Sequence, residues 1–153
     1  AILVTSDSTA AGKRKDKSGV IIRERVSKEN MEVVAYEILP DDISRIENWL
    51  RTQCSEGVDL ILTTGGSGLG PRDCTVEATQ KVIEREVPGI SEAIRDHGRE
   101  RTPYAMLSRA VAGVCGKTLI VNLPGSSRGA EESLDAVLPG LLHAFKMMRG
   151  GGH

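Results

Sequence analysis

Residues 60–79 read LILTTGGSGLGPRDCTVEAT, an apolar run that passes through a glycine-rich turn into a segment of helix-forming residues. The apolar run extends back to residue 58 and predicts a buried strand over residues 58–64. Thr75 can cap a helix over residues 75–86, with an acidic residue in its first turn. A strand that leads through a tight turn into a helix is the first half of a βαβ unit, so this segment predicts an α/β fold.

The same alternation extends along the rest of the chain. Residues 6–17 are polar and predict a loop. Because strands alternate with helices, we expect right-handed crossovers and a mostly parallel sheet with helices on both faces, to which an antiparallel hairpin is added. We expect one domain over residues 1–149 and a flexible tail over residues 150–153. Further strands are expected at residues 1–5, 32–39, 110–115 and 118–123, and further helices at residues 18–30, 41–55, 90–101, 129–137 and from Pro139 to about residue 149.

The composition argues against several classes of partner. Lys and Arg total 20 and Asp and Glu total 21, so the net charge of −1 gives no positive field to attract nucleic acid or an anionic membrane. No apolar run reaches the roughly 18 residues of a membrane span, and the N-terminus lacks a signal-peptide pattern. The 3 cysteines have neither metal-ligand nor disulfide-framework spacing, which favours reduced thiols and a cytoplasmic location.

Ligands of open parallel sheets bind beyond the carboxyl ends of the strands. This rule draws attention to the loops that follow Thr5, Leu39, Thr64 and Leu123. The four glycines within residues 65–70 let the backbone approach a ligand closely and turn its N–H groups toward an anion. The alternative is a merely flexible connection between a strand and a helix, but the position of the turn favours a phosphate-binding role.

Acidic residues lie beside this turn. A carboxylate at Asp73 would repel a bound phosphate unless a cation lies between them, so the arrangement predicts Mg²⁺. Asp41 and Asp42 follow the neighbouring strand and would converge with Asp73 if the strands lie on the same side of the sheet. The alternative interpretation of these acidic residues is helix capping, and the sequence leaves both interpretations open.

Other motifs narrow the chemistry further. The histidines show no zinc-ligand spacing, and no Ser or Cys is paired with a His that could activate it as a nucleophile. The glycines at 66, 68 and 70 lack the spacing of the dinucleotide fingerprint, and the GKT at 116–118 lacks the first glycine of a P-loop. A basic cluster in the first loop is either a solvated surface or a lid whose cations meet phosphate groups; it comprises Lys13, Arg14, Lys15 and Lys17.

Residues 60–79 and the run MLSRAVAGVCGKTLIVNLPGSSRGAEESL at 106–134 together resemble the two signatures of the molybdopterin adenylyltransferase family, which includes MogA, MoaB and the G domain of gephyrin. The LVTSDS at 3–8 and the LPDD at 39–42 also fit, so the resemblance covers essentially the whole chain. It implies a three-layer α/β fold and usually a homotrimer. It also implies Mg²⁺, ATP and molybdopterin, with AMP transferred from ATP to the molybdopterin phosphate and pyrophosphate released.

The resemblance also assigns residues. It makes Asp41 and Asp73 the catalytic acids, which we expect to hold Mg²⁺. Two departures from the family pattern, Ser67 for Thr and Val76 for Pro, touch no carboxylate. A molybdopterin-binding scaffold without turnover is the alternative function, and the related MoeA and CinA-like domains are a third possibility. The nucleotide- or molybdopterin-binding residues implied are Ser6, Asp7, Gly65, Gly66, Ser67, Gly68, Thr75, Ser108, Arg109, Pro124, Gly125 and Ser126.

Overall fold

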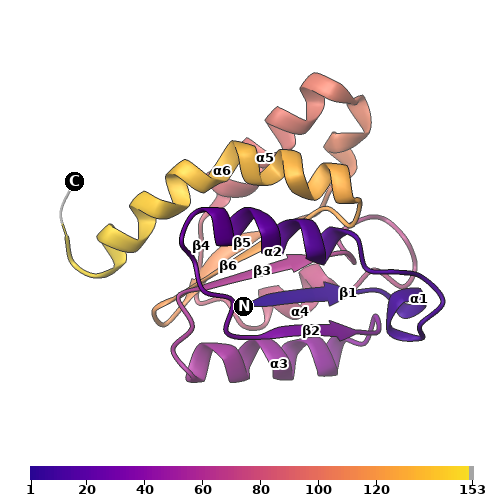
Figure 1. Cartoon of the computed structure of the whole chain (residues 1–153), viewed down its shortest axis with the longest axis horizontal. Helices are drawn as coiled ribbons and strands as arrows, with labels where there is room; N and C mark the ends of the chain where they lie inside the picture. Colours follow the sequence, from indigo (N-terminus) through magenta and orange to yellow (C-terminus); the bar gives the residue numbers. More distant parts are fainter. Residues whose placement is uncertain (152–153) are drawn as a thin grey trace.

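Six strands form one sheet in the order β2-β1-β3-β6-β5-β4 in the computed structural model, which describes residues 1–151 (Figure 1). The first four strands in this order are parallel, and β5 pairs antiparallel with both β6 and β4. The expected mostly parallel sheet with an antiparallel hairpin is therefore confirmed. The strands are β1 (Ile2–Thr5), β2 (Tyr36–Leu39), β3 (Leu60–Thr64), β4 (Arg85–Glu86), β5 (Ala112–Cys115) and β6 (Thr118–Leu123).

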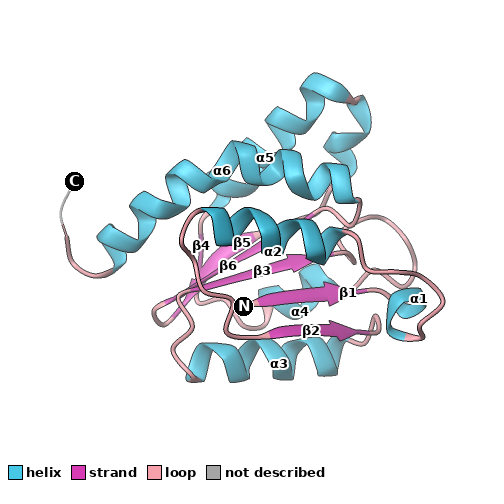
Figure 2. Ribbon diagram, viewed as in Figure 1, coloured by secondary structure: helices cyan, strands magenta, loops and turns pink. Residues whose placement is uncertain are grey.

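Helices cover both faces of the sheet and complete a three-layer α/β/α arrangement (Figure 2). Helices α2, α5 and α6 pack together on one face, whereas α3 and α4 pack together on the other. The helices are α1 (Asp7–Ala10), α2 (Ser18–Lys28), α3 (Ile43–Ser55), α4 (Thr75–Gln80), α5 (Pro88–Arg101), the 3₁₀ helix η1 (Pro103–Leu107) and α6 (Ser127–Met148). None of the helices in residues 1–151 is long and apolar enough to cross a membrane.

Alternation along the strands separates two hydrophobic clusters. Leu60 and Leu62 of β3 belong to the cluster beneath α2, α5 and α6, whereas Ile61 between them belongs to the cluster against α3 and α4. Successive side chains of a strand point to opposite faces, so each strand contributes to both clusters. Aliphatic residues make up nearly all of this core, as the low aromatic content predicts. The sheet is thus fixed from both sides, and its carboxyl edge is held as a rigid platform.

Several sequence-based boundaries are wrong. The strand expected over residues 32–39, for example, begins only at Tyr36. Residues 7–10 form the short helix α1 rather than a loop, because the Ser6 hydroxyl accepts a hydrogen bond from Thr9 N and caps it. The helix expected over 75–86 ends at Gln80, because the chain turns to pair with β5 and Glu84 N donates to Val114 O at 2.8 Å. The last helix is not interrupted at Pro139: α6 runs through it, with that proline on the exposed side.

The end of α6 is closed by glycine. Gly150 has φ +80°, a left-handed conformation that glycine adopts without strain. Its N–H donates to Met147 O and the N–H of Gly151 donates to Lys146 O, both at 3.0 Å, which is the Schellman pattern of a helix C-terminus. The first half of the expected tail therefore caps α6, while residues 152–153 lie outside the described residues.

Candidate functional site

Four loops meet at the carboxyl edge of the sheet, after β1, β2, β3 and β6 (Figure 1). Because β1 lies between β2 and β3, the loops that follow these three strands are immediate neighbours. The Pro124 carbonyl, in the loop after β6, accepts a 2.7 Å hydrogen bond from the Thr64 hydroxyl at the end of β3. The sequence prediction that these four loops share one edge is confirmed.

The glycine turn passes closer to its neighbours than any side chain would permit. Gly65 has φ +98° and Gly66 has φ +61°. A Cβ on Gly65 would lie 2.1 Å from Thr5 O, and one on Gly66 would lie 2.1 Å from Thr75 Oγ1. The turn is therefore packed directly against β1 and α4, and this placement depends on glycine.

Thr75 does not cap α4, contrary to the sequence prediction. It lies inside the helix, fully buried, and its hydroxyl pairs with the Thr5 hydroxyl at 2.8 Å. Its N–H donates to Gly66 O at 3.1 Å. The residue at the N-cap position is Cys74, whose side chain makes no capping bond and whose thiol has its pKa raised by burial. Thr75 thus joins β1, the glycine turn and α4.

Asp41 and Asp73 flank the glycine turn, and neither occupies the N-cap position of the helix that follows it. Asp42 caps α3, because its Oδ1 accepts a hydrogen bond from Arg45 N at 3.0 Å. Asp73 Oδ2 accepts instead from Gly70 N at 3.0 Å. Asp41 Oδ2 accepts from Asp7 N at 3.0 Å, whereas its Oδ1 is shielded from solvent and has no hydrogen-bond partner among residues 1–151. Capping of the following helix, α3 for Asp41 and α4 for Asp73, is therefore excluded as the explanation of both acids.

Arg72 ties three of these loops together. Its Nε donates to Asp7 Oδ2 at 2.9 Å and its Nη2 donates to Asp41 O at 3.0 Å. The hydrogen bond from the Arg72 side chain, together with one from Asp41 N, lowers the pKa of Asp7. Burial raises the pKa of Asp41, and the nearby carboxylates of Asp7 and Asp73 add to that effect. The negative charge at Asp41 is thus destabilised by its surroundings, a condition that a bound cation would relieve.

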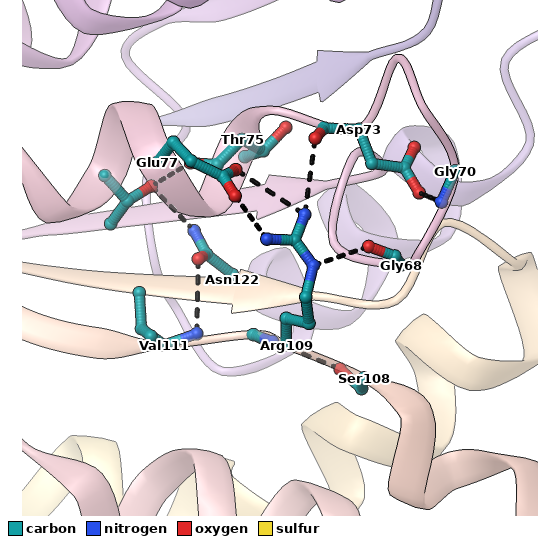
Figure 3. Close-up of polar contacts among 11 residues, drawn as sticks. Gly68, Gly70, Asp73, Thr75, Glu77, Ser108, Arg109, Val111 and Asn122 are labelled. Atoms are coloured by element: carbon teal, nitrogen blue, oxygen red, sulfur yellow. Dashed lines mark hydrogen bonds and ion pairs between the residues drawn. The ribbon is translucent and has the colours of Figure 1, made fainter.

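Arg109 holds the other side of the glycine turn (Figure 3). Its Nε donates to Gly68 O at 2.7 Å, its Nη2 donates to Asp73 O at 3.3 Å, and its Nη1 forms an ion pair with Glu77 of α4. Its backbone N–H also donates to Ser67 O at 2.9 Å. Both ends of the segment 67–73 are therefore attached to Arg109, which in turn is fixed to α4.

A buried asparagine supports this region from below (Figure 3). Asn122 of β6 is fully buried, and its amide nitrogen donates to the hydroxyls of Thr63 and Thr79 at 2.9 and 3.0 Å. Its Oδ1 accepts from Val111 N at 3.3 Å, two residues beyond Arg109. Buried polar groups stabilise a fold only when they are paired in this way. Asn122 thus links β3, β6 and α4 to the segment that carries Arg109.

Two pockets open on either side of the glycine turn. The polar pocket, about 370 Å³, lies between the loops after β1, β2 and β3 and includes Asp41 and the basic residues Arg14, Lys15 and Lys17. The apolar pocket, about 480 Å³, lies between α5, η1 and the start of α6. Both volumes are in the range of small-molecule sites. The wall between the pockets is shared and consists of Gly66, Asp73, Gly125 and Ser126.

The pockets divide the sequence-predicted site residues into four groups. Asp7, Thr75 and Arg109 line neither pocket and instead hold the residues that do. Ser6, Asp41 and Gly65 line the polar pocket alone. The apolar pocket alone is lined by Ser67, Gly68, Ser108 and Pro124, and the remaining predicted residues are those of the shared wall.

Sequence reasoning missed one side of the apolar pocket. Arg95 of α5 and Tyr104 of η1 lie outside the quoted signatures, and Ser133 of α6 lies within the second signature but was not recognised as a site residue. The apolar run YAML at residues 104–107, which follows a polar helical segment, was the available signal in the sequence. Glu77 was recognised only as an acidic residue in the first turn of a helix, and its pairing with Arg109 depends on tertiary structure.

The carboxylates suit a hard cation such as Mg²⁺. No group of three or more His, Cys, Asp and Glu side chains that could hold a metal occurs within residues 1–151. Mg²⁺ in phosphate-transfer sites needs only one or two carboxylates, since phosphate oxygens and waters complete its octahedron. Asp41 Oδ1, a shielded and unpartnered carboxylate oxygen, fits that requirement.

Comparison with known proteins gives a consistent result. Residues 1–143 match the family model described as a probable molybdopterin-binding domain. The chain is 42% identical over 153 residues to a molybdenum cofactor biosynthesis bifunctional protein of Chlorobaculum tepidum, covering all of this chain but only 49% of that protein. It is also 38% identical to a Helicobacter pylori molybdopterin adenylyltransferase, covering 97% of this chain and 86% of the relative.

The fold agrees with solved structures as well. The crystal structure of the molybdopterin biosynthesis enzyme MoaB from Thermus thermophilus superposes with a TM-score of 0.92 at 52% identity, over 97% of this chain and 94% of that one. The chain spans about half the length of the bifunctional relative and most of the length of the other two proteins. The chain therefore belongs to the family of probable molybdopterin-binding domains.

Proposed function

We propose that this protein acts in molybdenum cofactor biosynthesis as a molybdopterin adenylyltransferase that uses MgATP. The observation that carries the proposal is the pair of pockets that meet at a wall bearing Asp73, with Asp41 on the polar side. A transferase needs two substrates whose reacting atoms face each other, and two adjoining pockets provide that arrangement. The Helicobacter pylori relative, similar over almost the whole chain, carries this activity in its name.

The two pockets differ in chemistry and suit different substrates. The polar pocket, with its basic residues and glycine turn, suits the phosphates of ATP. The apolar pocket, lined by residues such as Leu107 and Arg95, suits the pterin ring system. The molybdopterin phosphate and the α-phosphate of ATP would then meet at the shared wall of Gly66, Asp73, Gly125 and Ser126.

The reaction is a single displacement at phosphorus. An oxygen of the molybdopterin phosphate attacks the α-phosphorus of ATP and forms the new phosphoanhydride bond. The bond from the α-phosphorus to the oxygen that bridges to the β-phosphate breaks, and pyrophosphate leaves with that electron pair. A phosphate oxygen needs no strong base to attack, so the lack of an activated nucleophile in the sequence is consistent with this chemistry.

Each part of the site has a task in this step. Asp41 and Asp73 would hold Mg²⁺, which neutralises charge on the phosphates when bound. The N–H groups of the glycine turn hold phosphate oxygens in place without reorganising during the reaction. Arg109 and Arg72 fix the turn and the acidic loops, and so maintain the alignment on which an in-line displacement depends.

The experiment that tests this proposal measures pyrophosphate release with molybdopterin and MgATP. We expect release that requires both substrates, and we expect Asp41→Asn and Asp73→Asn each to reduce turnover by about a hundredfold or more. Both variants should still bind molybdopterin, because the apolar pocket is largely intact. Molybdopterin binding by the wild type without any turnover would instead indicate a scaffold of the same fold.

We also propose a homotrimer in the cytoplasm. The support for the homotrimer is an exposed hydrophobic surface that includes lining residues of the apolar pocket and is made up of Leu69, Tyr104, Met106 and Leu107, whose exposed fractions range from 49% to 76%. Large exposed apolar patches mark association surfaces in soluble proteins. Light scattering distinguishes the outcomes, since a mass of one chain would reject the trimer.

A further inference from the structure

The segment 13–17, with the sequence KRKDK, is fixed at the rim of the polar pocket. At its start, Lys13 N donates to Ser8 O at 2.9 Å. At its end, Asp16 accepts hydrogen bonds from Gly19 N at 2.9 Å and from the Tyr36 hydroxyl of β2. A Cβ on Gly19 would lie 2.1 Å from that hydroxyl, so the anchor is closely packed. From the sequence, this segment could be either a solvated surface or a lid. In the structure, hydrogen bonds at both ends hold it in place as one wall of the polar pocket.

The cations of this wall are unpaired. Among residues 1–151, no side chain forms an ion pair or a hydrogen bond with the four cations Lys13, Arg14, Lys15 and Lys17. The other arginines around the site are all engaged: Arg72 with Asp7, Arg109 with Glu77 and Arg101 with Glu132. Arg14, Lys15 and Lys17 line the pocket. The segment thus presents free positive charge to whatever the pocket holds.

The unpaired cations of this wall can balance the negative charge of a nucleotide bound in the polar pocket. A nucleoside triphosphate with one Mg²⁺ carries a net charge of about −2, and the pocket already contains the carboxylates of Asp41 and Asp73. Without further cations, a filled pocket would concentrate about four negative charges in a space of about 370 Å³. The unpaired cations of the segment are the groups that can offset this repulsion.

The position of the wall shows which phosphates it would meet. The α-phosphate must lie at the shared wall, since it reacts with a group in the apolar pocket. The basic segment lines only the polar pocket and lies away from the apolar one. We propose that Arg14, Lys15 and Lys17 form a subsite for the β- and γ-phosphates of the nucleotide and for the pyrophosphate that these phosphates become. The assignment of a nucleotide as the ligand rests on the proposed function, whereas the expected affinity for pyrophosphate does not.

The test is a calorimetric titration of the protein with inorganic pyrophosphate in the presence of Mg²⁺. The variant is Arg14→Ala/Lys15→Ala/Lys17→Ala, in which all three side chains are exposed and the fold should survive. The matched control removes three exposed, unpaired cations elsewhere, as Lys28→Ala/Arg45→Ala/Lys117→Ala. We expect the site variant to lose affinity for pyrophosphate by roughly tenfold or more and the control by less than about threefold. Thermal denaturation checks that both variants are folded.

Three results would overturn the subsite. The first is that the wild type shows no measurable binding of pyrophosphate. The second is that the site variant and the control lose equal affinity for pyrophosphate, and the third is that the site variant keeps the wild-type affinity. Titration with molybdopterin distinguishes the two sources of phosphate. The site variant should bind molybdopterin with wild-type affinity. If it instead lost affinity for molybdopterin and kept its affinity for pyrophosphate, the segment would be assigned to the pterin phosphate. If the wild type binds pyrophosphate as expected but forms no adenylylated product, the subsite stands and the proposed function fails. Should the triple variant not fold, Lys15→Ala alone and the salt dependence of wild-type affinity provide the same test.

Discussion

Replacing Arg109 with alanine should weaken both the fold and the reaction. The side chain donates to the carbonyls of Gly68 and Asp73 and pairs with Glu77, so its removal frees segment 67–73 from α4 (Figure 3). Asp73 lies in that segment and Gly66 adjoins it. The substitution therefore perturbs the wall shared by the two pockets while leaving every wall residue in place.

The magnitude follows from the contacts. The 2.7 Å bond to Gly68 O is charge-assisted and should contribute about 1.5 kcal/mol. The side chains of Arg109 and Glu77 are 32% and 41% exposed, so solvent screening limits their ion pair to about 1 kcal/mol or less. The 3.3 Å bond to Asp73 O adds little. We expect a loss of about 2 kcal/mol in the free energy of unfolding and a fall in turnover of about tenfold to a hundredfold.

Urea denaturation and pyrophosphate-release kinetics measure the two effects. Arg128→Ala is the matched control, because Arg128 is 73% exposed and, within the described part of the chain, pairs only with Glu132 on the same helix. It should cost less than about 0.5 kcal/mol and leave turnover unchanged. In a double-mutant cycle, Arg109→Ala and Glu77→Gln should be coupled by about 1 kcal/mol. If Arg109→Ala behaves like the control in both assays, the positioning role assigned to Arg109 is wrong.

Three further predictions follow from the same region. Arg109 lowers the pKa of Glu77 below its usual 4.5, so the pair stabilises the fold above that pH and is lost as the pH falls through the lowered value; melting temperatures of wild type and Glu77→Gln should differ at pH 7 and converge progressively as the pH falls below 4.5. Asn122→Ala should lower the free energy of unfolding in urea by about 2 kcal/mol or more, because it leaves buried hydroxyl and amide groups unpaired; no loss would contradict the network. Gly66→Ala should abolish most turnover, since a Cβ there would lie 2.1 Å from a threonine hydroxyl, whereas Gly12→Ala, also at positive φ but with open space, should not; equal turnover in the two variants would refute the steric argument.

The sequence predicted the fold class and the location of the site because both depend on local patterns. Apolar runs bounded by turn residues marked the strands, and the rule for parallel sheets then placed four loops at one edge. Asp41 and Asp73 lie on either side of the glycine turn for the same reason, since β1 separates the strands that precede them.

Features that depend on long-range contacts were not predictable in this way. The apolar residues Val82 and Ile83 continue the helical pattern, but a hydrogen bond from Glu84 to β5 ends α4 at Gln80. The sequence could not decide whether Asp73 caps a helix or lines a pocket. The structure shows that its carboxylate accepts from Gly70 N instead of capping α4, and that the residue lines both pockets. The pairing of Arg109 with Glu77 joins residues 32 positions apart and leaves no signature in the sequence.

Transfer of the nucleotide itself tests the central claim most directly. The protein is mixed with molybdopterin, Mg²⁺ and ATP that carries a radioactive label on its α-phosphate, and the pterin is then separated and counted. The two-pocket arrangement predicts that label enters the pterin in equal amount to the pyrophosphate released, and that Asp73→Asn reduces both together. Pyrophosphate released without label in the pterin, or no release by a folded wild-type protein that binds both substrates, would contradict it.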